Sequence, residues 1–351
     1  MKLKSSSIRS TMLVSAAITL IAGTTPALAQ STSTVSQTGD INAATVAQTG
    51  SNSSDITQTG TQGVIFVDQN GAGQTSVVTQ SGIIADPTVI AGVDVIQNGT
   101  GNSSTVSQSA THSNFASDST FNGGRLLNSS PGVIVNQLGN DNVSNVDQGG
   151  TDTFATLFQI GDANNASVFQ DGSSTAPFIQ QVGNDNVAMA TSIGFHDEIN
   201  LGVIVQEGDR NNASFTRDGT TVGGTPFSFN LTITQIGEDN IASATQSGNL
   251  DMASIDQLGN GNVATTIQSA GGDGNLLQST QTGLNGSSAI TQAGLSNFAQ
   301  LNQGGESNVS SILQDGALNS AAVTQGGIGD TSMVVQTGMS NTATVSQNVA
   351  P

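Results

Sequence analysis

One short pattern of apolar and polar residues recurs from Gln37 to the end of the chain. A Gln is followed two residues later by Gly many times, and the preferred distance to the next such Gln is eleven residues. Aligned on that Gln, the repeat reads Q-x-G-x-x-N-x-A-x-Z-x, where x is any residue and Z is an aliphatic residue. Its Asn, Ala, aliphatic residue and the following Gln are each two residues apart. The repeat therefore predicts a β-strand with these four side chains on one face and mainly Ser, Thr and Asp on the other.

The glycine of each repeat predicts a tight turn between successive strands, because Gly adopts positive φ angles that other residues reach only at an energetic cost. A unit of eleven residues is too short to bury a core alone, so we expect two units to form one coil of 22 residues that stacks on similar coils. The predicted fold class is all-β, a β-solenoid of two-strand coils. The turn glycines assigned in this way are Gly39, Gly139, Gly161, Gly237, Gly294, Gly316 and Gly338.

The solenoid places Gln and Asn side chains in its interior, where an amide without a partner costs about 1–3 kcal/mol. In parallel coils about 4.8 Å apart, each carboxamide can donate to the identical group on one neighbouring coil and accept from the other. We therefore predict amide ladders along the solenoid axis. The ladder positions are Gln37, Asn42, Gln48, Gln137, Asn142, Gln148, Gln159, Asn164, Gln170, Gln235, Asn240, Gln246, Gln281, Gln292, Asn297, Gln303, Asn308, Gln314, Asn319, Gln325, Gln336, Asn341 and Gln347.

Longer steps interrupt the repeat but keep its phase. The step from Gln181 to Gln206 is 25 residues, twice eleven plus three, and the step from Gln206 to Gln235 is 29, twice eleven plus seven. Counting the skipped units gives about 26 strands in about 13 coils. Pro177 stands where the repeat has Ala, so we expect its coil to be locally weak. The loops that these steps predict at coil corners lie near residues 83–96, 109–136, 193–205, 218–234 and 269–280.

The first 29 residues predict a secretory signal peptide, with the solenoid occupying residues 30–351. Lys2, Lys4 and Arg9 form a basic start, an apolar stretch follows from Met12, and small residues precede Gln30. Without this leader, three basic residues face 25 acidic ones, a net charge of −22. A chain with so few cations is not expected to bind nucleic acid. With no Cys, it is not a disulfide scaffold either.

Candidate chemistry outside the repeat is sparse. His112 and His196 are the only histidines, both lie in the breaks, and neither has a partner at metal-ligand spacing other than Asp197 and Glu198. Ser is abundant, but no nucleophile motif surrounds any of them. We therefore expect no catalytic residue, no metal and no cofactor, and predict that the chain is not an enzyme.

The repeat resembles the curlin repeat, and the chain resembles curli fibre subunits, which are secreted bacterial functional amyloids of the biofilm matrix. The resemblance covers most of the chain from Gln37 to Gln347. It implies an extracellular fibre at the bacterial cell surface, built from this chain and related subunits. It also implies partners, namely an outer-membrane secretion channel and a nucleator. This sequence departs from the family in that Asn opens both strands of a coil, where the family commonly alternates Ser with Asn.

Two other classes of function are compatible with a solenoid. A monomeric extracellular adhesin or ligand-binding protein would use the outward Ser and Thr rows, which here are mixed with Asn, Asp and Phe. An enzyme built on a β-helix would need acidic and basic residues clustered on one face, which three Arg hardly allow. Since the repeats run close to both ends of the mature chain, we favour polymerisation through the open terminal coils.

Overall fold

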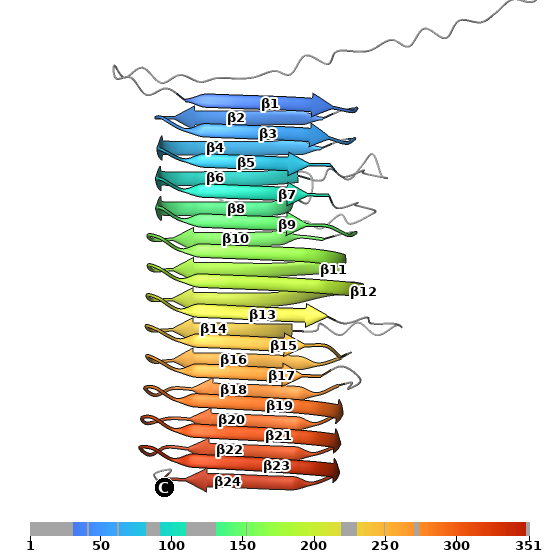
Figure 1. Cartoon of the computed structure of the whole chain (residues 1–351), viewed down its shortest axis with the longest axis vertical. Helices are drawn as coiled ribbons and strands as arrows, with labels where there is room; N and C mark the ends of the chain where they lie inside the picture. Colours follow the sequence, from blue (N-terminus) through green and yellow to red (C-terminus); the bar gives the residue numbers. More distant parts are fainter. Residues whose placement is uncertain are drawn as a thin grey trace, which may run out of the picture.

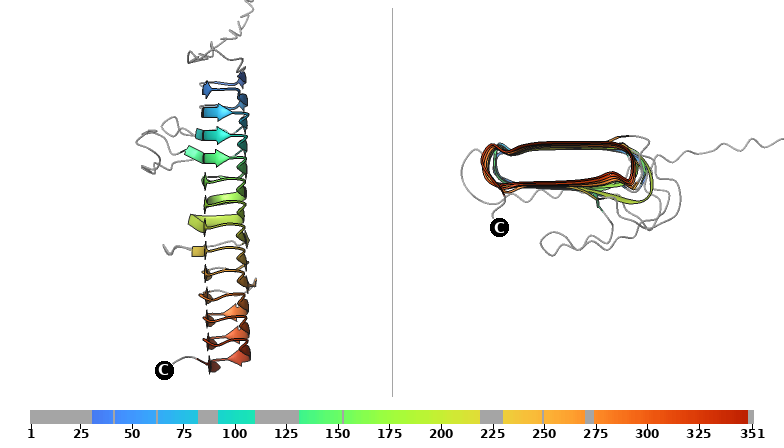
Figure 2. Two further views of the ribbon diagram at one scale, coloured as in Figure 1. Left: turned by 90° about the vertical axis from the view of Figure 1, so that its left-hand side faces the viewer. Right: turned by 90° about the horizontal axis from the view of Figure 1, so that it is seen from below.

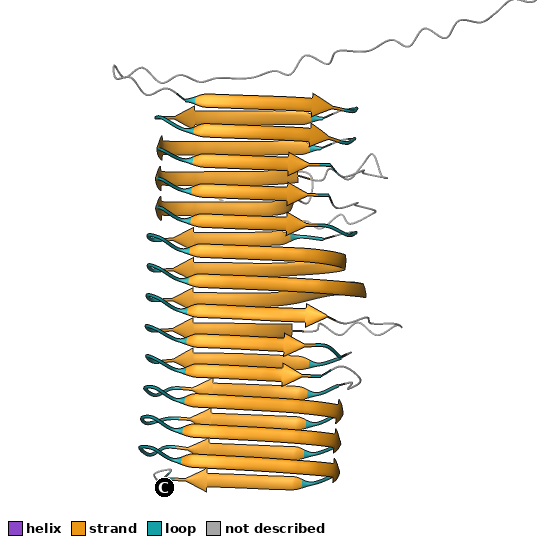
Figure 3. Ribbon diagram, in the orientation of Figure 1, coloured by secondary structure: helices purple, strands orange, loops and turns teal. Residues whose placement is uncertain are grey.

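A computed structural model describes residues 31–40, 42–61, 63–81, 92–109, 131–151, 153–218, 230–248, 250–269 and 274–348. All regular structure in these ranges is β-strand, without a helix (Figure 3). The chain winds into a flattened β-solenoid of about 12 turns with 22-residue spacing (Figures 1 and 2). The predicted fold class is confirmed. The signal peptide and His112 lie outside the described residues. No described segment is a helix suited to crossing a bilayer.

Two parallel walls form the solenoid, and we name them by the strands that they contain. The odd wall contains β1 (Thr32–Thr38), β3 (Ser53–Thr59), β5 (Thr75–Gln80), β7 (Ser103–Gln108), β9 (Val143–Gln148), β13 (Asn212–Asp218), β15 (Ile241–Gln246), β17 (Val263–Gln268), β19 (Ser287–Leu295), β21 (Val309–Ala317) and β23 (Thr331–Met339). The even wall contains β2 (Ala43–Thr49), β4 (Val64–Ala72), β6 (Gly92–Thr100), β8 (Pro131–Asn140), β10 (Ala155–Ile160), β14 (Asn230–Ile236), β16 (Met252–Leu258), β18 (Leu276–Gln281), β20 (Phe298–Gln303), β22 (Ser320–Gln325) and β24 (Thr342–Gln347).

Two long strands cross a corner and belong to both walls. The first parts of β11 (Asn165–Val182) and β12 (Val187–Glu207) pair within the odd wall, and their last parts pair within the even wall. Each wall therefore has 13 strand segments, which agrees with the number of coils counted from the sequence. Every pairing is parallel and joins a strand to its counterpart on the next coil.

The predicted corner insertions are shorter than expected, because strands resume within them. β6 begins at Gly92, β8 at Pro131, β14 at Asn230 and β18 at Leu276. The insertion predicted at 193–205 is wrong, since β12 runs through it. Its three extra residues fall at a register shift, where Ser173 pairs with Phe195 but Thr175 with Asn200.

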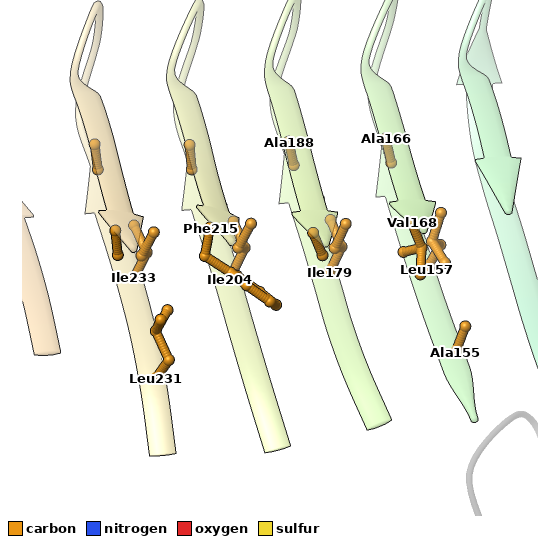
Figure 4. Close-up of a cluster of buried hydrophobic side chains, with 14 of the residues drawn as sticks. Ala155, Leu157, Ala166, Val168, Ile179, Ala188, Ile204, Phe215, Leu231 and Ile233 are labelled. Atoms are coloured by element: carbon orange, nitrogen blue, oxygen red, sulfur yellow. The ribbon is translucent and has the colours of Figure 1, made fainter. Parts of the chain in front are cut away.

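The core is a narrow layer of aliphatic side chains between the walls. Inward positions alternate with outward ones along every wall, and Leu157, Ile179, Ile204 and Ile233 are fully buried (Figure 4). Where Phe215 replaces the usual aliphatic residue, its ring fills the space beside Gly202 of the facing wall. A Cβ on Gly202 would lie 2.3 Å from the Phe215 Cζ atom. Pro177 of β11 is buried and pairs with Gly202 on the next coil of the even wall. The strand β11 continues through Pro177.

Candidate functional site

Glutamine side chains form a column inside each wall, as the sequence predicted, and the column is continuous in the even wall but interrupted once in the odd wall. In the even wall the Nε2 of every Gln donates to the Oε1 of the Gln on the next coil, over 2.7–2.9 Å from Gln48 to Gln347. The odd wall has the same bonds from Gln37 to Gln170 and from Gln246 to Gln336. Nearly all of these side chains are buried.

Each glutamine also uses its second amide hydrogen. Gln292 Nε2 donates to the Leu276 carbonyl over 3.1 Å, and Gln314 Nε2 to the Phe298 carbonyl over 2.9 Å. These bonds reach across the coil corner to the start of the preceding even-wall strand. A column glutamine with glutamines on both neighbouring coils, such as Gln292 or Gln314, thus uses both donors and its acceptor, so burying it leaves no amide group unpaired.

The asparagine columns combine the predicted ladder bonds with bonds to the turn backbone. In five places the Nδ2 of one Asn donates to the Oδ1 of the Asn on the preceding coil, for example from Asn186 to Asn164 over 3.0 Å. Asn164 Oδ1 accepts the backbone N–H of Asn186 over 3.1 Å, and Asn164 Nδ2 donates to the Gly183 carbonyl over 2.7 Å. Asn297 and Asn319 repeat the backbone-accepting bond at the opposite corner. The side chain of Asn is one methylene shorter than that of Gln, and here it fastens the turn backbone of one coil to the next.

The predicted ladder residues all lie in these columns. Those in the odd-wall Gln column are Gln37, Gln148, Gln170, Gln246, Gln292, Gln314 and Gln336. Those in the even-wall Gln column are Gln48, Gln137, Gln159, Gln235, Gln281, Gln303, Gln325 and Gln347. The Asn positions at the two coil corners are Asn42, Asn142, Asn164, Asn240, Asn297, Asn308, Asn319 and Asn341.

The predicted ladder set leaves out nine column glutamines, which are Gln58, Gln69, Gln80, Gln97, Gln108, Gln181, Gln206, Gln257 and Gln268. It also leaves out two members of the odd-wall column that are not amides, Ser192 and Arg217. They occupy the rungs between Gln170 and Gln246, and both are buried. Each lies eleven residues after a Gln of the even wall, so the spacing marked both positions. The residue type hid them, because neither is an amide.

The predicted turn glycines all have positive φ, for example 113° at Gly161 and 128° at Gly316. Close stacking adds a second requirement for Gly. A Cβ on Gly316 would lie 1.9 Å from the carbonyl oxygen of Gly338 on the next coil. Gly338 belongs to the last coil, and the nearest atom to its Cβ would be Asn341 Nδ2 at 3.8 Å.

Carboxylates at the turns are separated by amides. In the turns that lead from the even to the odd wall, Asn140, Asp162, Asn184 and Asp209 follow one another on successive coils. Asp162 Oδ1 accepts from Asn140 N and Nδ2 over 2.8 and 2.9 Å, and Asp209 Oδ1 accepts from Asn184 N and Nδ2 over 2.8 and 3.1 Å. From Asn140 to Asp209, this alternation keeps carboxylates from facing each other directly in this turn column, where they would repel.

Arg210 continues this arrangement where two acidic turns meet. Its guanidinium lies 2.9 Å from Glu238 and 2.7 Å from Asp239. The hydrogen bonds to Asp239 and Glu238 raise the pKa of Arg210, and the hydrogen bond from Arg210 lowers the pKa of Asp239 below its usual value. All three side chains are about half exposed, so this ion pair is solvated.

Both ends of the solenoid are open among the described residues. At one end β1 pairs only with β3 and β2 only with β4, and at the other β23 pairs only with β21 and β24 only with β22. The inward aliphatic side chains of the interior coils are almost fully buried, whereas Val35 and Val345 of the end coils are only partly buried. Each end therefore presents two unpaired strand edges and the amide columns between them.

The inward residues of the two ends match in seven of eight columns, and the exception is the corner column that begins at Ser31 and ends at Asp330. Ser33, Val35 and Gln37 of β1 correspond to Ser332, Val334 and Gln336 of β23. On the even wall, Asn42, Ala44, Val46 and Gln48 correspond to Asn341, Ala343, Val345 and Gln347. A second copy placed on either end would continue these seven columns with the residues that they already contain.

The amide columns also give the two ends opposite hydrogen-bonding character. Every Gln donates toward the C-terminal end, so the last coil presents the Nε2 groups of Gln336 and Gln347. The first coil presents the acceptor Oε1 of Gln48, which is buried and has no partner. Donors therefore face acceptors only when the C-terminal end of one copy meets the N-terminal end of another.

No protein-family model matches the chain, and no curated protein matches it significantly. Within the described ranges, no three His, Cys, Asp or Glu side chains come together as a metal-binding group. The fold and the columns define a two-walled β-solenoid with amide-filled interior columns and two complementary open ends.

Proposed function

We propose that this chain is the structural subunit of an extracellular curli-like amyloid fibre, which grows by adding copies end to end. The match between the two open ends supports the proposal most strongly, because seven inward columns continue with identical residues and the amide donors of one end meet the acceptors of the other. Each added copy would also pair two unpaired strand edges.

The setting of the fibre comes from the resemblance to the curli family. On that basis we propose a secreted protein that reaches the cell surface through an outer-membrane channel, grows from a nucleator and contributes to biofilm matrix and surface adhesion. The role is structural, without catalysis, cofactor or nucleic acid.

Gly338→Ala tests end-to-end growth. In the separate molecule the new Cβ has free space, and the φ of 100° at Gly338 costs an Ala some backbone strain. In the fibre the Cβ would in addition meet the Gly39 carbonyl of the next copy, as a Cβ on Gly316 would meet the Gly338 carbonyl at 1.9 Å. We expect the variant not to polymerise alone and, in small amounts, to stop growth of wild-type fibres from seeds. Thioflavin fluorescence and electron microscopy measure both effects.

Gly329→Ala is the matched control. Gly329 also has positive φ, at 68°, and no atom lies within 4 Å of its added Cβ. Its column tolerates other residues, since Ser307 on the preceding coil has a φ of 56°. We expect this variant to form fibres at the wild-type rate. Circular dichroism of both monomers checks that they fold.

Gln37→Leu addresses the opposite end and does not depend on glycine geometry. It removes the acceptor for the Gln336 amide of the incoming copy and leaves that donor buried without a partner, so it should also slow growth. A wild-type chain that stays a folded monomer with and without seeds would contradict the fibre and support the alternative, a monomeric adhesin or ligand-binding solenoid.

A further inference from the structure

The outward faces of the two walls differ in chemistry. Among the described residues, the strands of the odd wall carry 15 of the 24 exposed large hydrophobic side chains. The strands of the even wall carry five, namely Leu138, Ile160, Ile236, Met252 and Leu258, and the other four lie in turns. Those of the odd wall are Val77, Val143, Phe169, Val187, Met189, Ile193, Ile241, Val263, Ile267, Leu295, Val309, Leu313, Met333, Val335 and Met339. Even-wall aromatics such as Phe158 and Phe178 are half-buried, with ring centroids 6.0 Å apart.

The C-terminal part of the odd wall is also free of charge. From β12 to β23, the three outward columns that begin at Val187, Met189 and Thr191 contain no acidic or basic residue. Asp218 and Asp315 come only after these columns, at the wall's edge. Closer to the N-terminus the same wall carries outward carboxylates, for example Asp55 and Asp147. Over the same coils the corresponding outward columns of the even wall contain one carboxylate, Asp256, so the odd-wall face is distinguished by having no charge and by its larger number of apolar side chains.

We propose that this face, the outward side of the odd wall from β12 to β23, binds the same face of a second copy and so joins two fibres side by side. The inference rests on the proposed function. Two strongly acidic molecules repel each other over most of their surfaces. They can bury a contact without unpaired carboxylates only where neither presents one. A flat sheet face meets another at about 10 Å, with side chains interleaved.

The area explains why pairing would follow polymerisation. Seven strand segments spaced about 4.8 Å apart, each about 20 Å long, cover about 700 Å². A stable interface buries about 800 Å² on each partner, so one pair of monomers falls slightly short. In a fibre the face recurs with every copy, and many weak contacts act together. We therefore expect monomers to stay separate and fibres to pair.

The test places the same two charges on either wall. Ile267→Glu with Leu313→Glu changes two odd-wall residues that are 39% and 40% exposed and lie on alternate coils. Thr280→Glu with Thr324→Glu changes the corresponding outward column of the even wall, also on alternate coils. Fibre width by electron microscopy measures pairing, and seeded thioflavin kinetics measure elongation.

We expect paired fibres from the wild type and from the even-wall variant, and single fibres from the odd-wall variant at an unchanged elongation rate. Single wild-type fibres, or pairing that survives the odd-wall charges, would overturn the lateral surface and leave the proposed function intact. If the odd-wall variant still pairs but no longer adsorbs to a hydrophobic surface, the face serves adhesion, and the proposal of lateral pairing is overturned. Absence of fibres from all three proteins would contradict the proposed function, and this inference with it.

Discussion

The glutamine columns of the two walls differ in one place, and the difference shows what such a column requires. The even-wall column runs unbroken from Gln48 to Gln347. The odd-wall column is broken at Ser192 and Arg217. Only a side chain with both a donor and an acceptor, long enough to reach the next coil, can continue the column. At the break, the amides of the flanking glutamines need hydrogen-bond partners from outside the column.

The two glutamines that flank the break differ in whether their amide groups find new partners. Gln170 Nε2 turns to Thr175 Oγ1, which it reaches over 2.8 Å. On the other side, Gln246 Oε1 is buried and has no partner. Arg217 is only 5% exposed, and burial lowers its pKa to about 9, with the nearby Asp251 opposing that shift. Arg217 is thus a buried cation, and Asp251 at the next corner favours its charged form.

Removing that carboxylate should have the largest effect. Asp251→Asn leaves the Arg217 guanidinium buried without a counter-charge, and we expect the free energy of unfolding to fall by about 3–5 kcal/mol. Urea unfolding of monomers carrying Gly338→Ala, which we expect not to polymerise, measures it.

The double variant Arg217→Gln with Asp251→Asn sharpens the comparison, since it rebuilds the column. The introduced glutamine would reach Gln246 Oε1, and the introduced asparagine could still accept the Asn275 N–H that Asp251 accepts over 2.8 Å. Replacing a buried ion pair with a neutral set is often neutral or stabilising. We expect the double variant to be at least as stable as the wild type. A double variant no better than Asp251→Asn would show that the ion pair is not what strains this coil.

Breaking the intact even-wall column should cost slightly less. Gln303→Leu removes the acceptor of the Gln281 amide and the donor to Gln325 Oε1, which leaves both groups buried without a partner, and we expect a loss of about 2–4 kcal/mol. Gln300→Leu in the same strand is the control, because that amide is outward and reaches Gln278 only over 3.4 Å. Equal losses in the two variants would mean that the column contributes nothing beyond an ordinary surface amide.

The next smaller effect concerns the packing of Phe215 beside the break in the odd-wall column. Gly202→Ala would place a Cβ 2.3 Å from the Phe215 ring, and we expect overpacking to cost about 1–3 kcal/mol. Phe215→Val makes room for that methyl group. The two changes together should therefore cost less than the sum of each alone, in the same urea assay. If the losses in the free energy of unfolding were additive, Gly202 and the Phe215 ring would not be energetically coupled.

The smallest effect should come from the outer ion pair of Arg210. Because Arg210 lowers the pKa of Asp239, their contribution is present above the usual aspartate pKa and disappears as the pH falls through the lowered value. We expect Arg210→Gln to be slightly less stable than the wild type at pH 7, with the difference vanishing in strong acid or high salt. A difference unaffected by pH and salt would point to packing instead.

Much of this architecture was predictable because the repeat is strict. The eleven-residue period, the alternation of inward and outward residues and the Gln type together fix the two walls, the coil length and the Gln columns. The phase also survived the long steps, so the number of coils could be counted through them.

What the sequence did not reveal depends on contacts between coils. The Asn164 side chain accepts from the Asn186 side chain as a ladder would, but its additional bond to the turn backbone of Asn186 could not be read from the residue type. The dependence of Arg217 on Asp251 joins residues on different coils that no repeat relates. The strand course of β12 through 193–205 required a register shift, which spacing alone does not separate from a loop.

The parallel stacking of coils has a mechanical consequence. When the rod is pulled lengthwise, its hydrogen bonds bear the load and its coil interfaces act in series, so the weakest interface sets the rupture force. We expect that interface to lie beside Ser192 and Arg217. The two coils there remain joined by about 25 residues of covalent chain, which can extend by roughly 80 Å. Such a rod would lengthen under tension before it parts.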